Sequence, residues 1–231
     1  MEKSHWNGKK WYAYGTSITS EAQGKYVQYV KEFSGMEVKN FGFPGGAITD
    51  LGKHPKGQIY DCVTSLTDGK QEADLITLEV VPNEEGELGD KFDNTRSTFC
   101  GCLNQCIRFL QENTNAQIVV LCSVPTKIEP SEQRSYYERA IAVEEVCKIN
   151  RVYCLNSQNG LGYARIKNND KYTIDNIHQT DLGGYNYAQY IWSNLKNIPL
   201  WFCAQQTRRT FSPCHTQRFF SKTISTSRAC S

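Results

Sequence analysis

Three residues of this sequence have the side chains that nucleophilic catalysis by serine requires: Ser17, Asp175 and His178. A serine hydroxyl is a weak nucleophile until a neighbouring base takes its proton. Histidine is the natural base near neutral pH, and a carboxylate fixes its tautomer and stabilises the imidazolium. Because Asp175 and His178 are three positions apart, one turn of a loop can hold both in register. The set predicts Ser17 as nucleophile, His178 as base and Asp175 as the acid that orients the base.

Acyl transfer also needs hydrogen-bond donors that stabilise the oxyanion of the tetrahedral intermediate. Three groups could supply them: the backbone amides of Ser17 and Gly45, and the side-chain amide of Asn83. A glycine at position 45 lets the backbone approach a substrate closely, which a Cβ atom would obstruct. We therefore expect Ser17, Gly45 and Asn83 to form an oxyanion hole.

Hydrophobic periodicity predicts a regular alternation of strands and helices that would carry these residues. The expected strands are 11–14, 37–41, 73–81, 117–123 and 152–155. The expected helices are 24–33, 59–66, 97–112, 133–149 and 180–195, the last one capped by Thr180 or Asp181. The long segment 156–179 has no clear period, and loops of that length are usually functional or disordered.

Strands that alternate with helices predict a parallel sheet, because parallel strands need crossover connections. The predicted fold class is α/β, a three-layer α/β/α flavodoxin-like sandwich with a central, mainly parallel five-stranded sheet. Ligands of such sheets bind beyond the carboxyl ends of the strands. Ser17, Gly45 and Asn83 each follow a predicted strand, so we expect them to meet at that edge.

The residues Ser17, Gly45, Asn83 and His178 resemble the four sequence blocks of the SGNH (GDSL-like) hydrolase family. In that family Ser, Gly, Asn and His come from separate blocks in this order, and an Asp-x-x-His block lies near the C-terminus. The resemblance spans about Lys10 to Trp201 and implies the same roles as above. It also implies an esterase that needs no cofactor and no metal and cleaves a small acyl ester, with an acetyl group on a carbohydrate as the leading substrate.

The third block departs from the family pattern, which usually reads Gly-x-Asn-Asp where this chain has Val81-Pro82-Asn83-Glu84. Valine in place of glycine could block a tight backbone approach, since β-branched residues tolerate few unusual dihedral angles. Pro82 also favours extended geometry at Val81. Glu84 keeps the charge of the family's aspartate but has a longer reach.

Two other functions remain open at this point. A spoiled third block would leave a catalytically impaired carbohydrate-binding protein on the same scaffold, in which Tyr163, Tyr172 and Tyr185 could stack on sugars. A transferase that moves the acyl group to an alcohol would use the same nucleophile, Ser17.

Composition excludes some partners and divides the chain. With 231 residues, 39% of them hydrophobic, and a net charge of +2, the chain has no global field that would attract nucleic acid or an acidic membrane. We expect no nucleic-acid partner and no membrane insertion. The segment 203–231 contains five basic residues and no acidic one. We therefore predict one domain over 1–201 and a basic, disordered tail over 202–231.

The ten cysteines do not follow the spacing of a zinc site or of a short disulfide scaffold. Cys100, Cys102 and Cys106 share one predicted helix, whereas Cys122 and Cys154 lie in predicted strands, where thiols pack as small hydrophobes. Met1–Lys10 is polar, which does not fit a signal peptide. We therefore expect free thiols and a cytoplasmic location.

Overall fold

The centre of the structure, a computed structural model that describes residues 4–49, 58–123, 130–157, 161 and 171–199, is one sheet of five strands. The strand order is β2-β1-β3-β4-β5, and every neighbouring pair is parallel. The strands are β1 (Lys10–Gly15), β2 (Glu37–Gly42), β3 (Leu75–Val80), β4 (Gln117–Cys122) and β5 (Tyr153–Asn156). The order 2-1-3-4-5 is the flavodoxin-like arrangement.

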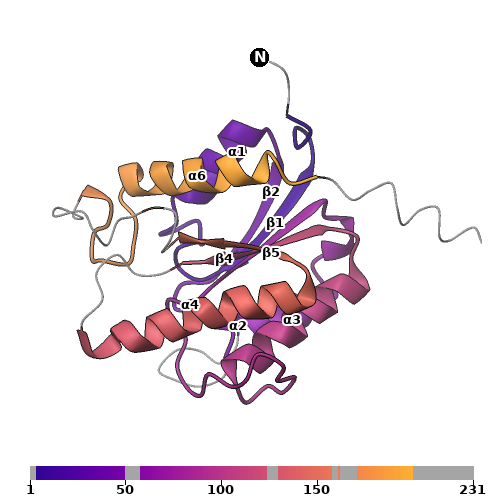
Figure 1. The fold of residues 1–231 in the computed structure, drawn as a ribbon. Helices are drawn as coiled ribbons and strands as arrows, with labels where there is room; N and C mark the ends of the chain where they lie inside the picture. The colour runs from indigo at the N-terminus through magenta and orange to yellow at the C-terminus, as the bar shows by residue number, and fades with distance from the viewer. Residues whose placement is uncertain (1–3, 50–57, 124–129, 158–160, 162–170, 200–231) are drawn as a thin grey trace, which may run out of the picture. The chain divides into compact units, whose positions relative to one another are not determined.

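Helices cover both faces of this sheet. In Figure 1, α1 and α6 lie together on one face, and α2, α3 and α4 lie on the other. Their bounds are α1 (Tyr26–Ser34), α2 (Gln58–Thr64), α3 (Phe99–Asn113), α4 (Pro130–Asn150) and α6 (Asp181–Leu195), and a short 3-10 helix, η1 (Lys70–Glu72), precedes β3. The predicted three-layer α/β/α flavodoxin-like sandwich is confirmed, and its sheet is entirely parallel.

The burial of the strands follows from this layering. All six residues of β3 are buried, as expected of a central parallel strand that is covered on both faces. In β2, which forms one edge of the sheet, no residue is buried. Because β1, β2 and β3 are parallel, their carboxyl ends lie at the same end of the sheet. The loops that follow these strands carry Ser17, Gly45 and Asn83.

Most observed boundaries lie within three residues of the predicted ones, and the differences have local causes. The helix expected from residue 97 begins at Phe99, because Thr98 caps it by accepting the amide of Gly101 at 3.1 Å. Thr180 caps α6 in the same way by accepting the amide of Gly183. The strand expected to reach Val81 ends at Val80, because Val81 has a positive φ of 102°.

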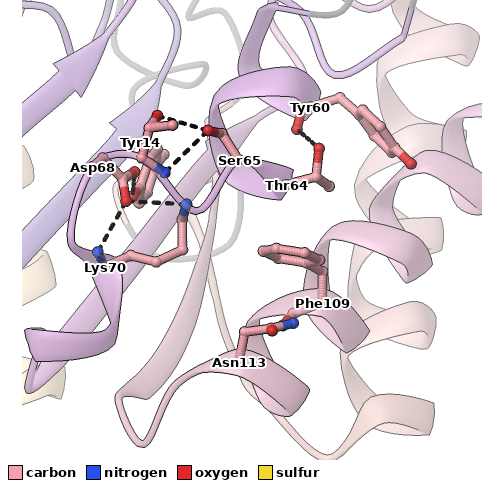
Figure 2. Close-up of polar contacts among 9 residues, drawn as sticks. Tyr14, Tyr60, Thr64, Ser65, Asp68, Lys70, Phe109 and Asn113 are labelled. Atoms are coloured by element: carbon pink, nitrogen blue, oxygen red, sulfur yellow. Dashed lines mark hydrogen bonds and ion pairs between the residues drawn. The ribbon is translucent and has the colours of Figure 1, made fainter.

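A buried lysine, which the sequence patterns did not identify, joins β1 to η1 and α3. The side chain of Lys70 is 0% exposed, and its Nζ lies 3.0 Å from Oδ1 of Asp68. Asp68 also accepts the Lys70 amide at 2.9 Å and the hydroxyl of Tyr14 on β1, as Figure 2 shows. The ring of Phe109 on α3 lies below the ammonium, with its centroid 5.8 Å away. The Asp68 carboxylate is therefore the main partner of a charge that has lost its hydration.

Replacing Asp68 by alanine should strongly destabilise the fold, because it leaves the Lys70 ammonium buried without a counter-ion. Removal of one partner of a buried pair typically costs about 3–5 kcal/mol, whereas an apolar replacement of both partners costs much less. The double variant Asp68→Ala/Lys70→Met should therefore be more stable than Asp68→Ala alone. Urea unfolding of the three proteins measures this difference, and a double variant less stable than Asp68→Ala would contradict it.

Some predictions fall on residues that the structure does not describe, among them the tail 202–231 and Tyr163. The compact unit to which the sheet belongs is Met1–Pro199. Within the described ranges, no helix has the length and apolar character needed to cross a membrane. The cysteines of the described ranges are free thiols, as expected: Cys62, Cys100, Cys102, Cys106, Cys122, Cys147 and Cys154.

Candidate active site

Ser17 lies in a tight turn that follows β1. The amides of Thr19 and Ser20 both donate to the carbonyl of Thr16 at 3.1 Å, which closes one helical turn around the serine. The Ser20 hydroxyl donates to the carbonyl of Ser17 at 3.0 Å. Ser17 is 4% exposed, so its hydroxyl is shielded from bulk water and its position is fixed by the turn.

Asp175 and His178 lie in a second closed loop, directly before α6. An antiparallel bridge between Thr173 and Gln179 closes the loop at its base. The Asp175 side chain accepts the backbone amide of His178 at 2.7 Å, which is the local geometry that aspartate favours in turns. Asn176 has a φ of 70°, a conformation that asparagine tolerates better than most residues. The loop thereby holds both functional side chains in register, as their spacing predicted.

The two loops bring the three candidate residues together, although Ser17 and His178 are 161 positions apart in sequence. Nε2 of His178 lies 2.9 Å from Oγ of Ser17, and Nδ1 of His178 lies 2.6 Å from Oδ2 of Asp175. A carboxylate can only accept, so the Nδ1 nitrogen carries the proton. The lone pair of Nε2 is therefore left to accept the hydroxyl proton of Ser17.

The charge state of Asp175 suits this arrangement. Partial burial raises the pKa of Asp175, but the hydrogen bonds from the His178 ring and from the amides of His178 and Ile177 outweigh it. The resulting pKa lies below its usual value. The carboxylate therefore stays ionised near neutral pH. Its side chain is 51% exposed and that of His178 is 23% exposed, so water weakens the attraction between them.

The expected oxyanion donors lie in the loops after β1, β2 and β3. Gly45 has a φ of 72°, a conformation that glycine adopts without strain. Within the described residues, neither the Ser17 amide nor the Gly45 amide donates to another protein group, so both are available to a ligand. The Asn83 side chain donates one amide hydrogen to the carbonyl of Gly46 at 2.9 Å. The second hydrogen of that amide is the one that an oxyanion could use.

Glu84, one of the two unusual residues of the third block, is hydrogen-bonded to the loop that contains Gly45. It is buried, and its carboxylate accepts the amide of Ile48 at 2.7 Å and the hydroxyl of Thr49 at 2.8 Å. Burial raises the pKa of Glu84, while these hydrogen bonds lower it in part. The longer side chain of glutamate therefore connects the loop after β3 to the loop that contains Gly45.

Val81, the other unusual residue, occupies a conformation that favours glycine. Its φ is 102°, and its side chain is fully buried in the core. The carbonyl of Val81 accepts the amide of Glu84 at 3.2 Å, so the chain turns here and brings Asn83 toward the site. A β-branched residue with positive φ stores conformational strain of about 1–3 kcal/mol.

This strain predicts that Val80→Gly and Val81→Gly will lower the free energy of unfolding by different amounts. Val80 is equally buried but lies inside β3, so Val80→Gly should cost about 3 kcal/mol from lost burial and added chain entropy. Val81→Gly loses the same side chain but relieves the strain, and should cost about 1–3 kcal/mol less. Chemical denaturation of both variants tests this, and equal losses of stability would show that Val81 is unstrained.

Tyr185, considered above as a sugar platform, packs edge-on against Tyr29 and Phe33 of α1, at centroid distances of 5.4 and 5.6 Å. Glu79 is a buried acid that contacts the Ser17 turn and was not among the predicted site residues. An acidic residue inside an otherwise uncharged strand is the signal that could have identified it. In the part of the chain that the structure describes, no group of three or more His, Cys, Asp or Glu side chains could hold a metal.

Comparison with known proteins gives matches of structure only. No protein-family model matches the chain, and no curated protein sequence does. The acetylxylan esterase Axe2 from Geobacillus stearothermophilus superposes with a TM-score of 0.62 at 13% identity, over 84% of this chain and 96% of its own. A catalytic mutant of the same esterase gives 0.63 at 12%, over 84% and 96%. Another crystal structure gives 0.69 at 18%, over 84% and 98%. At these identities, the likeness shows that the fold is shared.

Proposed function

We propose that this protein is a serine ester hydrolase of the SGNH type. The observation that carries the proposal is the continuous pair of contacts from Ser17 Oγ to His178 Nε2 and from His178 Nδ1 to Asp175. Three hydrogen-bonded groups in this order activate a hydroxyl for attack on a carbonyl. The available amides of Ser17 and Gly45 supply donors for the oxyanion that such an attack creates.

The reaction would proceed through an acyl-enzyme in two steps. Ser17 Oγ forms a bond to the ester carbonyl carbon while its proton passes to Nε2 of His178. The alcohol leaves when the bond from carbon to the ester oxygen breaks, and it takes that proton from His178. A water molecule then gives a proton to His178 and attacks the acyl carbon. The bond from that carbon to Ser17 Oγ breaks, the acid leaves, and His178 passes its proton to Oγ, which restores the Ser17 hydroxyl. Asp175 stabilises the imidazolium in both steps.

We further propose an acetyl ester of a carbohydrate as the substrate class. The support comes from the esterase Axe2, whose catalytic mutants replace a serine, an aspartate and a histidine. In that enzyme the aspartate precedes the histidine by three positions, as Asp175 precedes His178 here. A small acyl group also suits a nucleophile that is itself 4% exposed.

Labelling with a fluorophosphonate probe, followed by mapping of the labelled peptide, tests the proposal. An activated serine should react at Ser17 and lose its label after pre-incubation with excess acetyl ester. In parallel, the protein should release acetate from acetylated xylooligosaccharides. Absence of both label and acetate release would refute the hydrolase and favour the carbohydrate-binding alternative. Transfer of acetyl to an added alcohol, without free acetate, would identify a transferase.

A further inference from the structure

A buried acid lies against the turn that carries Ser17, and the mechanism above does not use it. Glu79 is the fifth residue of β3 and is 0% exposed. Its Oε2 accepts three hydrogen bonds: from the Thr16 amide at 2.7 Å, the Thr16 hydroxyl at 2.7 Å and the Thr19 hydroxyl at 3.2 Å. Thr16 immediately precedes Ser17, and Thr19 follows it by two positions. One carboxylate oxygen therefore holds the turn on both sides of the serine.

The neighbouring hydroxyls are arranged to donate toward this carboxylate. Thr19 Oγ1 lies 2.9 Å from the hydroxyl of Tyr26 on α1, so when Thr19 donates to Glu79 it accepts from Tyr26. The hydroxyl of Ser123, after β4, lies 2.8 Å from the hydroxyl of Tyr187 on α6. The acid thus ends a chain of hydrogen bonds that begins at Tyr26 on α1 and passes through Thr19.

The backbone at the start of this turn also has little free space around it. A Cβ atom on Gly15 would lie 2.2 Å from Oγ1 of Thr19 and 2.7 Å from Oε2 of Glu79. Only glycine fits between these two side chains, which fixes the end of β1 against the acid. The turn therefore has little freedom to move while the Glu79 contacts are intact.

The ionised form of Glu79 is costly to the fold. Burial raises the pKa of Glu79 to about 7, although the hydrogen bonds from Thr16 and Thr19 oppose this rise. The titratable groups that face it are Tyr26 from α1, Tyr187 from α6 and Cys122 from β4; burial raises the pKa of each, so all three are neutral. Protonated Glu79 makes its whole contribution to the stability of the fold below the ordinary pKa of glutamate. It is lost as pH rises through about 7.

We infer that Glu79, in its carboxylate form, is a positioning residue that fixes the Ser17 turn for attack. This rests on the proposed function, because the Ser17 hydroxyl is taken as the nucleophile. A charged acceptor binds the amide and the two hydroxyls more strongly than a neutral one does. Small displacements of a reacting group cost large factors in rate, so loosening this turn should affect turnover more than substrate binding.

The experiment compares the wild type with Glu79→Gln, Thr16→Val and the double variant in hydrolysis of 4-nitrophenyl acetate. Glu79→Gln should lower kcat by about 10–100-fold and change KM by less than about 3-fold. The loss in the double variant should be smaller than the two single losses combined, because both substitutions remove the contact between Glu79 and the Thr16 hydroxyl. If Glu79→Gln does not fold, Thr16→Val alone decides, since it removes one donor and keeps the acid.

Two pH measurements separate positioning from a merely structural role. In a plot of log kcat/KM against pH, the acid limb should be steeper for the wild type than for Glu79→Gln. Only in the wild type does falling pH protonate the Glu79 carboxylate. The melting temperature of Glu79→Gln should rise relative to the wild type between about pH 4.5 and 7. Unchanged kcat, equal steepness of the two limbs, or a rate loss explained by unfolding would each overturn the inference.

Failure of the proposed function can be told apart from failure of this inference. If the wild type neither labels at Ser17 nor hydrolyses the ester, the hydrolase proposal fails irrespective of Glu79. Crystal structures of the wild type and Glu79→Gln then decide the positioning role. Separation of Ser17 Oγ from His178 Nε2 beyond hydrogen-bond distance in the variant would support it, and an unmoved Ser17 would overturn it.

Discussion

Ser17→Ala should abolish ester hydrolysis while leaving the fold unchanged. The substitution removes the atom that attacks the carbonyl, and loss of a serine nucleophile typically lowers kcat by on the order of 10⁴-fold or more. Ser17 makes its side-chain hydrogen bond to His178 across the site, so no element of the core depends on that hydroxyl. Turnover of 4-nitrophenyl acetate and mapping of fluorophosphonate label measure the effect.

Ser193→Ala is the matched control, because Ser193 is an exposed serine of α6 whose hydroxyl donates only to the carbonyl of Tyr190. It should keep wild-type turnover and wild-type labelling. Circular dichroism and thermal unfolding should be the same for both variants and the wild type. Retention of turnover or label in Ser17→Ala would show that another residue is the nucleophile.

Asp175→Asn should lower kcat by about 10²–10⁴-fold and change stability little. The asparagine oxygen can still accept backbone amides of the loop, as the Asp175 carboxylate accepts those of Ile177 and His178. Its amide group, however, can donate to Nδ1 of His178, which favours the tautomer with the proton on Nε2. That tautomer cannot take the proton of Ser17. Because both side chains are partly exposed, we expect the loss to lie toward the lower end of this range.

Asp181→Asn provides the control for Asp175→Asn, since Asp181 lies nearby in the first turn of α6 and its side chain is 80% exposed. It should retain wild-type kcat. Steady-state kinetics across the neutral pH range measures both variants. The pKa of Asp175 lies below its usual value, so the loss should be constant over this range. Equal turnover of Asp175→Asn and the wild type would refute the role of Asp175.

The sequence was sufficient to predict the layers of the fold. Continuous apolar runs such as 117–123 occur where a strand is covered on both faces, and the helical spacing of residues 24–33 marks a face that packs on the sheet. These patterns are local, so they can be read without coordinates. Cap residues were also readable, as Thr180 shows, because capping depends on side chains within three or four positions.

The sequence also determined which residue types could form the site and in what order. The three-residue spacing of Asp175 and His178 predicted a loop that holds both, and the observed loop does so through hydrogen bonds between near neighbours. The placement of Ser17, Gly45 and Asn83 after strands followed from the rule that ligands of parallel sheets bind beyond the carboxyl ends.

Tertiary structure alone decided the contacts between distant segments. The 2.9 Å contact of His178 with Ser17, the bonds from Thr16 to Glu79 and the bond from Tyr14 to Asp68 depend on how β1, β3 and the loops pack. No local pattern encodes such contacts, because burial and hydrogen bonding of a charged side chain depend on residues far away in sequence. The same is true of Val81, whose positive φ results from the turn that the surrounding core imposes.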